Sequence, residues 1–122
     1  MTAPSPNKSP CPGDRCPIDS LLRLLMGPWT TLILWTLHTR GEHRFGELRK
    51  AITGISARVL TERLRMLEEH GIVYRKHVAV IPPQVSYGLT TRGLELRSVL
   101  QPVAEIALRW QQEDRAMADR VA

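Results

Sequence analysis

The sequence predicts a mostly helical domain with a small β-hairpin, and three features of the chain lead to this prediction. Apolar residues recur at helical spacing in several separate segments. Residues 73–80 are instead β-branched and extended, Pro82 and Pro83 make a bend, and residues 85–89 return as the second strand. The 122-residue chain has 43% hydrophobic but only 5% aromatic residues, which suits one domain with a modest aliphatic core.

Two helices are expected in the first third of the chain. Pro17 suits the first position of a helix, because its fixed φ matches and it has no N–H to leave unsatisfied. One apolar face follows at i, i+3, i+4 and i+7 and consists of Ile18, Leu21, Leu22 and Leu25. Gly27 and Pro28 end this helix. Residues 29–39 are apolar nearly all round, which predicts a buried central helix.

A pair of shorter helices is expected before the hairpin, after a minor edge strand at residues 43–44. The inner face of the first is formed by Phe45, Leu48 and Ile52. After a turn at Gly54, Ser56 can cap the second helix by accepting a hydrogen bond from an early backbone N–H. The inner stripe of this second helix is Leu60, Leu64 and Leu67. Its opposite stripe is polar and consists of Arg58, Thr61, Glu62 and Arg65.

The last segment predicts a helical region with an apolar seam, and Thr90 is a suitable residue to cap its start. A heptad-like spacing of 3, 4, 3 and 4 residues links Leu96, Val99, Val103, Ile106 and Trp110. Pro102 is expected to break or kink this helix. Because so small a domain offers little core, we interpret the seam as a subunit interface. The alternative is that the seam folds back onto its own core.

The domain boundaries follow from composition. Residues 1–15 are rich in proline and polar residues and contain no apolar run, which predicts a disordered arm rather than a signal peptide. The folded domain is expected over residues 16–115, including the terminal helix, and a tail over 116–122. The longest apolar stretch, Leu32 to Trp35, is far short of the ~20 residues of a membrane span. We therefore expect no membrane association and a cytoplasmic, nucleoid-associated protein.

The positive charge is concentrated in one part of the chain. The formal net charge is +5. Residues 44–76 contain eight basic and four acidic side chains, a net of +4, whereas residues 92–122 contain five of each. The excess charge therefore lies on the predicted helix pair and hairpin, where a nucleic-acid backbone would require it. A solubilising surface is the alternative interpretation.

The order helix, turn, helix, hairpin is the order by which a winged helix-turn-helix presents one helix to the DNA major groove. In addition, Cys16-Pro17 and three later motifs resemble the HxlR-type branch of the MarR-like bacterial transcription regulators. Those motifs are Gly-x-Trp-Thr at 27–30, Arg-Phe-x-Glu-Leu at 44–48 and Leu-Thr-x-x-Gly at 89–93. The resemblance covers about Cys16 to Trp110. It implies a winged helix-turn-helix that dimerises through its terminal helices and acts as a repressor on a roughly palindromic operator.

The residues expected to contact DNA lie mainly on the polar stripe. Arginine can form a bidentate pair with guanine and threonine can bond a base edge, so major-groove contacts are expected from Arg58, Thr61 and Arg65. Ser56 and the N–H groups at the helix start suit a DNA phosphate, and Lys50 and Arg44 are weaker phosphate candidates. Contacts to the DNA backbone or minor groove are expected from Arg75 and Lys76 on the hairpin. The alternative is an ordinary solvated stripe in which an arginine pairs with Glu62 or Glu69.

Cys11 and Cys16 are the residues with possible redox chemistry. Without a secretory signal, both are expected to be free thiols in a reducing compartment. Cys16 lies at the start of the first helix, where backbone N–H groups and the helix dipole stabilise a thiolate. The resemblance implies that Cys16 senses oxidants or electrophiles, and Cys11 could resolve the oxidised form. The alternative for Cys16 is an inert, packed thiol.

The sequence contains no catalytic set, Gly-rich phosphate loop or nucleophile elbow, and its four histidines lack metal-ligand spacing. We therefore expect neither an enzyme nor a metal or cofactor. Two alternative functions remain open. In one, the same DNA-binding fold is switched by a small apolar effector at the dimer interface, lined by Trp29, Trp35 and Trp110. In the other, the winged helix serves only as a protein-interaction module.

Overall fold

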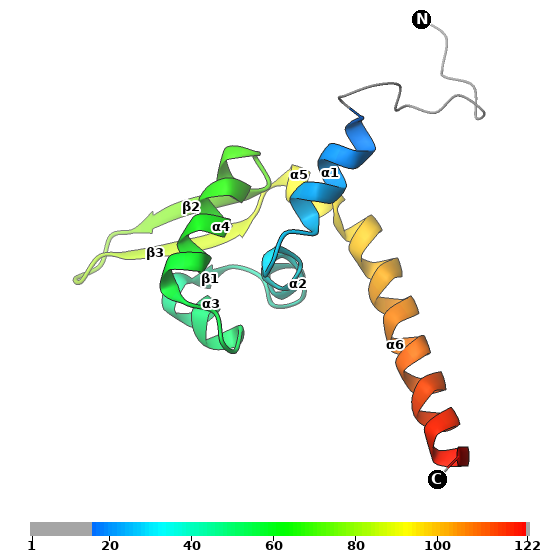
Figure 1. The fold of residues 1–122 in the computed structure, drawn as a ribbon. Coiled ribbons are helices and arrows are strands. Elements are labelled where there is room, and N and C mark those ends of the chain that lie inside the picture. Colours follow the sequence, from blue (N-terminus) through cyan, green and yellow to red (C-terminus); the bar gives the residue numbers. More distant parts are fainter. Residues whose placement is uncertain (1–15, 122) are drawn as a thin grey trace, which may run out of the picture.

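Helices and a three-stranded antiparallel sheet make up residues 16–121, the part of the chain that this computed structural model describes (Figure 1). The elements in chain order are α1 (Pro17–Leu25), α2 (Thr30–Arg40), β1 (His43–Arg44), α3 (Phe45–Ala51), α4 (Ala57–Glu69), β2 (Val73–Val78), β3 (Gln84–Leu89), α5 (Thr91–Glu95) and α6 (Arg97–Val121). The prediction of a mostly α fold with a hairpin wing is confirmed. The predicted arm at residues 1–15 lies outside the described residues.

Local capping explains where several helices begin. The Val59 N–H donates to Ser56 Oγ at 3.1 Å, which confirms Ser56 as the cap of α4. The Gly93 N–H donates to Thr90 Oγ1 at 3.1 Å at the start of α5. Pro17 is at the first position of α1. Each of these starts depends on residues close in sequence, so the chain's local chemistry sets them.

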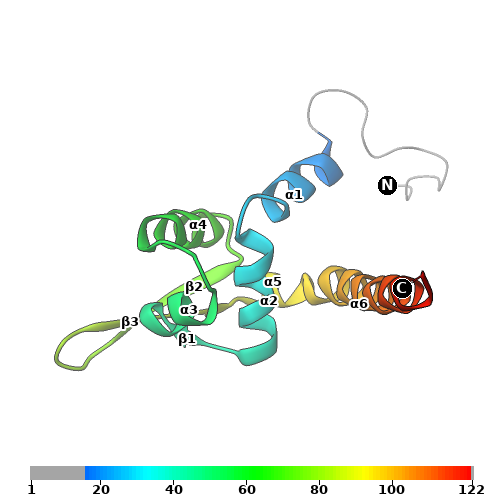
Figure 2. The ribbon, with the colours of Figure 1, turned by 60° about the horizontal axis from the view of Figure 1, so that its bottom comes forward.

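The buried core lies around α2. Ile33 and Leu34 of α2 are completely buried, and they belong to one apolar cluster with Leu48 of α3 and the inner stripe of α4. Figure 2 shows α2 in the middle of the molecule, with α3 and α4 on one side and α6 on the other. The inner stripe predicted for α4 is confirmed, because Leu60, Leu64 and Leu67 are all buried. Its opposite stripe therefore faces away from the core.

The sheet has the order β1-β3-β2, so β3 lies between the short edge strand and the other arm of the hairpin. Tyr74 of β2 is opposite Gly88 of β3. A Cβ at Gly88 would overlap the Tyr74 ring, so the glycine makes room for that ring. The Tyr74 hydroxyl donates to Glu42 Oε1 at 2.6 Å. This contact joins the base of the hairpin to the segment that follows α2.

The C-terminal region differs from the sequence-based expectation in two respects. The helix does not break at Pro102, because α6 continues through this residue, and the interruption lies at Leu96, between α5 and α6. A proline inside a helix removes one backbone hydrogen bond, which the other bonds of a 25-residue helix outweigh. The helix also reaches Val121, whereas we expected a tail from residue 116. Figure 1 shows α6 extending away from the rest of the molecule.

His38 of α2 places an imidazole where a positive charge is unfavourable. Both ring nitrogens are shielded from solvent. Burial lowers the pKa of His38 below its ordinary value of 6.5, the nearby charge of Arg97 lowers the pKa further, and the Gly93 backbone acts in the opposite direction. The neutral ring is therefore the form that fits the folded state.

Acidification is expected to destabilise the fold through His38. Because the folded pKa lies below the unfolded one, the unfolded chain binds the proton first as pH falls. The contribution of His38 to the free energy of unfolding is complete above the pKa of the unfolded chain, about 6.5. It is lost as pH falls towards the pKa of His38 in the folded state. Urea unfolding from about pH 8 to pH 5 should show this decline. His38→Gln should flatten it, whereas His77→Gln, on the exposed part of β2, should not. If stability falls with pH equally steeply in the His38→Gln and His77→Gln variants, His38 is not the cause of the decline.

Candidate nucleic-acid interface

The outward face of α4 presents the polar side chains predicted to contact DNA. Arg58, Thr61 and Arg65 are all exposed, on the side opposite the buried leucines of the same helix. The Arg58 side chain is 88% exposed. Ser56, also exposed, marks the N-terminal end of this face. The arrangement places two guanidinium groups and two hydroxyls along one open helix surface.

Local bonds distinguish the two arginines on this face. Arg58 Nε donates to Glu62 Oε1 at 3.2 Å, which is the intrahelical pairing considered as the alternative to DNA contact. Among residues 16–121, no hydrogen bond or ion pair joins Arg65 to another side chain. An exposed pair such as Arg58–Glu62 contributes little free energy, so Arg58 can exchange its partner for DNA at small cost. Arg65 can make such a contact without losing an ion pair.

A groove of about 630 Å³ lies between α3, α4 and the end of the hairpin. Three of the predicted DNA-contacting residues, Arg44, Lys50 and Thr61, line it together with Gln84 of β3. The Arg44 backbone N–H donates to Glu47 Oε1 at 3.1 Å, and the two side chains approach to 3.9 Å. The structure thus brings two cations and the middle of α4 to one concave surface.

Gln84 is a residue of this groove that the sequence analysis missed. It is half-buried, and its Oε1 is buried without a hydrogen-bond partner among the described residues. In the sequence it is a single amide after two prolines, and nothing local to it indicates a neighbour on α4. Only the return of β3 alongside α3 brings Gln84 near Thr61.

The two basic residues of the wing lie on opposite faces of the sheet. Arg75 is opposite Tyr87, and Lys76 is opposite Ser86, in the antiparallel pairing of β2 with β3. Successive side chains of a strand point to opposite faces. The Tyr87 ring packs near Phe45 of α3, with centroids 6.5 Å apart, so Arg75 shares the face that α3 covers. Both side chains are exposed.

Cys16 is the N-cap of α1, and its Sγ accepts a hydrogen bond from the Asp19 N–H at 3.5 Å. The predicted position at a helix start is confirmed. The structure holds Cys16 in a disulfide bond, however, so the expected free thiol is wrong for this state. The expectation of a free thiol rested only on the cellular compartment. The compartment sets the redox potential around the protein, but it does not determine whether a second sulfur lies close enough to bond with Cys16. Cys11 lies outside the described residues.

The predicted apolar seam divides into a buried and an exposed part. Leu96 is only 8% exposed and belongs to the core cluster of its own chain. The remaining members, Val99, Val103, Ile106 and Trp110, are exposed on α6. Met117 and Val121 continue the exposed stripe at helical spacing. On α1, the exposed apolar side chains are Ile18, Leu21 and Leu22.

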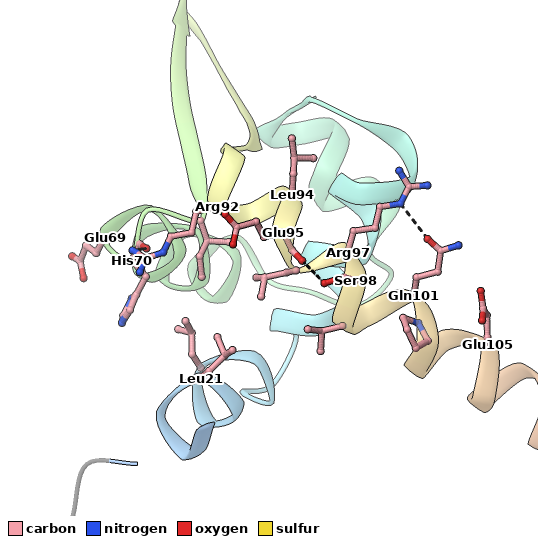
Figure 3. A pocket seen from close by; sticks show the side chains of 15 residues that line it. Leu21, Glu69, His70, Arg92, Leu94, Glu95, Arg97, Ser98, Gln101 and Glu105 are labelled. Atoms are coloured by element: carbon pink, nitrogen blue, oxygen red, sulfur yellow. Dashed lines mark hydrogen bonds between the residues drawn. The ribbon is translucent and has the colours of Figure 1, made fainter. Parts of the chain in front are cut away.

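A second groove, of about 1360 Å³, separates α1 from α5 and α6 (Figure 3). Its apolar walls include Leu21, Leu24 and Val99, and its polar rim includes Arg92 and Glu105. Arg92 Nη1 donates to the His70 carbonyl at 3.3 Å. The three tryptophans expected to line an effector pocket do not line this groove. Trp29 and Trp35 pack against the core instead, and Trp110 is exposed on α6.

Metal-ligand clusters and membrane-length apolar helices are both absent from residues 16–121. No group of three or more His, Cys, Asp or Glu side chains in this range could hold a metal ion. No single helix in the same range is long and apolar enough to cross a membrane. The α1–α2 pair has the length and apolar composition of a membrane span only when the two helices are taken together, and the pair is bent by 80°.

The fold and this surface define a class of protein. A helix-turn-helix (α3 and α4) followed by a hairpin wing, with an exposed basic and polar face on the second helix, is a winged helix-turn-helix of the MarR-like kind, a transcription regulator class. The chain belongs to the family described as HxlR-like helix-turn-helix, whose model matches residues 24–115.

Relatives and solved structures that resemble this chain are also transcription regulators. The chain is 40% identical over 110 residues to an HTH-type transcriptional regulator of Synechocystis sp., covering 88% of this chain and 81% of that protein. A MarR-family transcriptional regulator from Porphyromonas gingivalis has a similar structure, with 31% identity and a TM-score of 0.73, covering 80% of this chain and 95% of the other. The redox regulator HypR in its oxidized form matches with 33% identity and a TM-score of 0.71, covering 77% and 96%.

Proposed function

We propose that this protein is a homodimeric transcriptional repressor that binds a roughly palindromic operator. The observation that carries the proposal is the exposed face of α4, which presents Arg58, Thr61 and Arg65 beyond a capped helix start. In the proposed complex α4 occupies the major groove, where arginine reads guanine and threonine reads a base edge or a thymine methyl.

Backbone contacts are proposed on both sides of α4. The groove next to α4 supplies Arg44 and Lys50, and the helix start supplies Ser56 with its neighbouring N–H groups. The wing supplies Arg75 and Lys76. Contacts of this kind set the register and orientation of a protein on DNA, while base contacts supply the sequence preference.

The homodimer is proposed from the apolar surface that the single chain leaves exposed. The exposed apolar stripes on α1 and α6 border the larger groove. Their side chains are accessible to solvent in the single chain. A second copy would cover this surface, and a two-fold dimer would place its two α4 helices in half-sites about one DNA turn apart.

The test begins with genomic fragments of the host retained by the purified protein. A fragment shared among the retained sequences should shift in a gel at low protein concentration, and unrelated DNA should displace it poorly from the protein. The logarithm of affinity should fall steeply with the logarithm of salt concentration, since phosphate contacts release counterions. In a transcription assay the protein should lower the output of a promoter that overlaps the site. A protein that retains no specific fragment acts instead as an interaction module.

A thiol switch is the proposed form of regulation. The supporting observations are Cys16 at the N-cap of α1, its disulfide bond, and the likeness to a redox regulator described in its oxidized form. In the reduced protein the helix N-terminus favours the Cys16 thiolate. Oxidation of two thiols to a disulfide releases two protons and two electrons, which diamide takes up as its N=N bond becomes a hydrazine. The bond would then alter α1, next to the proposed dimer surface.

Cys16→Ser is expected to bind the operator as the parent does and to lose the response to diamide or a quinone. Cys11→Ser should lose at most the reversible disulfide, because Cys16 still reacts with electrophiles. Operator titrations before and after treatment, with mass spectrometry of the modified chain, measure both effects. An unchanged affinity after complete alkylation of Cys16 would show that this thiol has no regulatory role.

The second candidate keeps the DNA binding and replaces the thiol switch with an apolar effector. The groove of about 1360 Å³ beside α1 and α6 is the observation that favours it. A ligand there would change how α1 and α6 pack. The Cys16→Ser variant separates the two candidates, because an effector that does not modify a thiol should still release this variant from DNA.

A further inference from the structure

The tip of the wing is apolar, which is unusual for a segment so close to a basic surface. Residues 79–83 read Ala-Val-Ile-Pro-Pro and contain no polar side chain. Ile81 is fully exposed at 101%, and Val80 is 42% exposed. Figure 1 shows the β2–β3 hairpin projecting beyond the helices, at the end of the molecule away from α6. Ile81 therefore takes no part in the core of its own chain.

The backbone of the tip presents this side chain with little freedom. Pro82 and Pro83 have restricted φ angles and no N–H groups. The Val80 N–H donates to the Val78 carbonyl at 2.9 Å and closes the turn before Ile81. A restrained tip loses less conformational entropy on binding than a flexible one. The tip is thus suited to insertion into a narrow surface.

The position of the tip relative to α4 indicates its partner. Pro83 at the end of the tip and Gln84 directly after it line the same groove as Thr61 of α4 and Lys50 of α3. Arg75 and Lys76 lie on the strand that leads to the tip. The hairpin is therefore continuous with the proposed DNA surface. On a duplex the groove next to a major groove is a minor groove, so a minor groove is the surface that a projecting hairpin beside α4 would meet.

We propose that Ile81, supported by Pro82, is an apolar wedge for the minor groove of the operator. This inference rests on the proposed DNA binding. An apolar side chain in the minor groove packs against the sugars or enters a base step, and pyrimidine–purine steps open most easily. The wing then favours a deformable sequence beside each half-site without forming base hydrogen bonds. Unlike Lys76, Ile81 neutralises no phosphate, so its contact releases no counterions.

The test measures operator affinity against salt for the parent, Ile81→Ala and Lys76→Ala. Ile81→Ala should weaken binding about three- to tenfold, by loss of buried apolar surface, with the same salt slope as the parent. Lys76→Ala should reduce the slope by about one. Ile81→Leu, which keeps an apolar side chain of the same size, should bind nearly as the parent does. Because Ile81 is fully exposed and Lys76 is exposed as well, none of these changes removes a core contact.

A minor-groove ligand such as distamycin locates the contact. When it occupies the sequence beside each half-site, the parent and Ile81→Ala should bind equally. Equal affinity of both proteins for the free operator would overturn the inference, as would a difference that distamycin leaves intact or a lower salt slope for Ile81→Ala. A parent protein that binds no operator at all would instead remove the proposed function.

Discussion

Replacing Val103 and Ile106 together with aspartate is expected to convert the protein to a monomer and to abolish tight operator binding. Both side chains are exposed in the single chain, so the changes leave its core intact. In the proposed dimer they would bury carboxylates without partners, at a cost of several kcal/mol. A monomer binds only one half-site, so the loss of DNA affinity should exceed that of any single contact residue.

Sedimentation measures this effect, with circular dichroism to show that the helices remain. Leu108→Asp is the matched control, because Leu108 is also exposed on α6 but points roughly 200° around the helix from Ile106. The control should remain a dimer if the interface follows the stripe of Val103 and Ile106. A double variant that sediments as a full dimer would show that α6 does not hold the subunits together through this stripe.

Arg65→Ala is expected to weaken operator binding by about 1–3 kcal/mol and to relax the preference at one base position. Arg65 is exposed on the outward face of α4, where arginine can form a bidentate pair with guanine. Arg58→Ala should have a slightly smaller effect, because Arg58 first gives up its weak, exposed bond with Glu62. Glu62→Ala, which releases Arg58, should accordingly strengthen binding.

A panel of operators with single base changes measures both the affinity and the preference. Arg109→Ala is the control for net charge, since Arg109 lies on α6 and approaches Glu113 at 4.0 Å. It should leave the base preference unchanged. If Arg58→Ala and Arg65→Ala both bind every operator as the parent does, the recognition surface is not on α4.

The sequence by itself determined the elements whose causes are local. Ser56 and Thr90 bond to N–H groups three residues away, and Pro17 starts α1, so these helix starts could be predicted from neighbouring residues. The buried stripe of α4 follows from spacing alone. The order of the elements and the family motifs predicted the winged helix-turn-helix, and with it the exposed face of α4.

Only the tertiary structure decided which side chains meet across the fold. Leu96 has the spacing of the exposed seam, yet the turn between α5 and α6 directs it into the core. Gln84 reaches the groove beside Thr61 because β3 returns past α3, and Trp29 and Trp35 pack on the core instead of lining a pocket. The physical reason is the range of the interactions. Caps and periodicity act within a few residues, whereas burial depends on contacts between segments far apart in the chain.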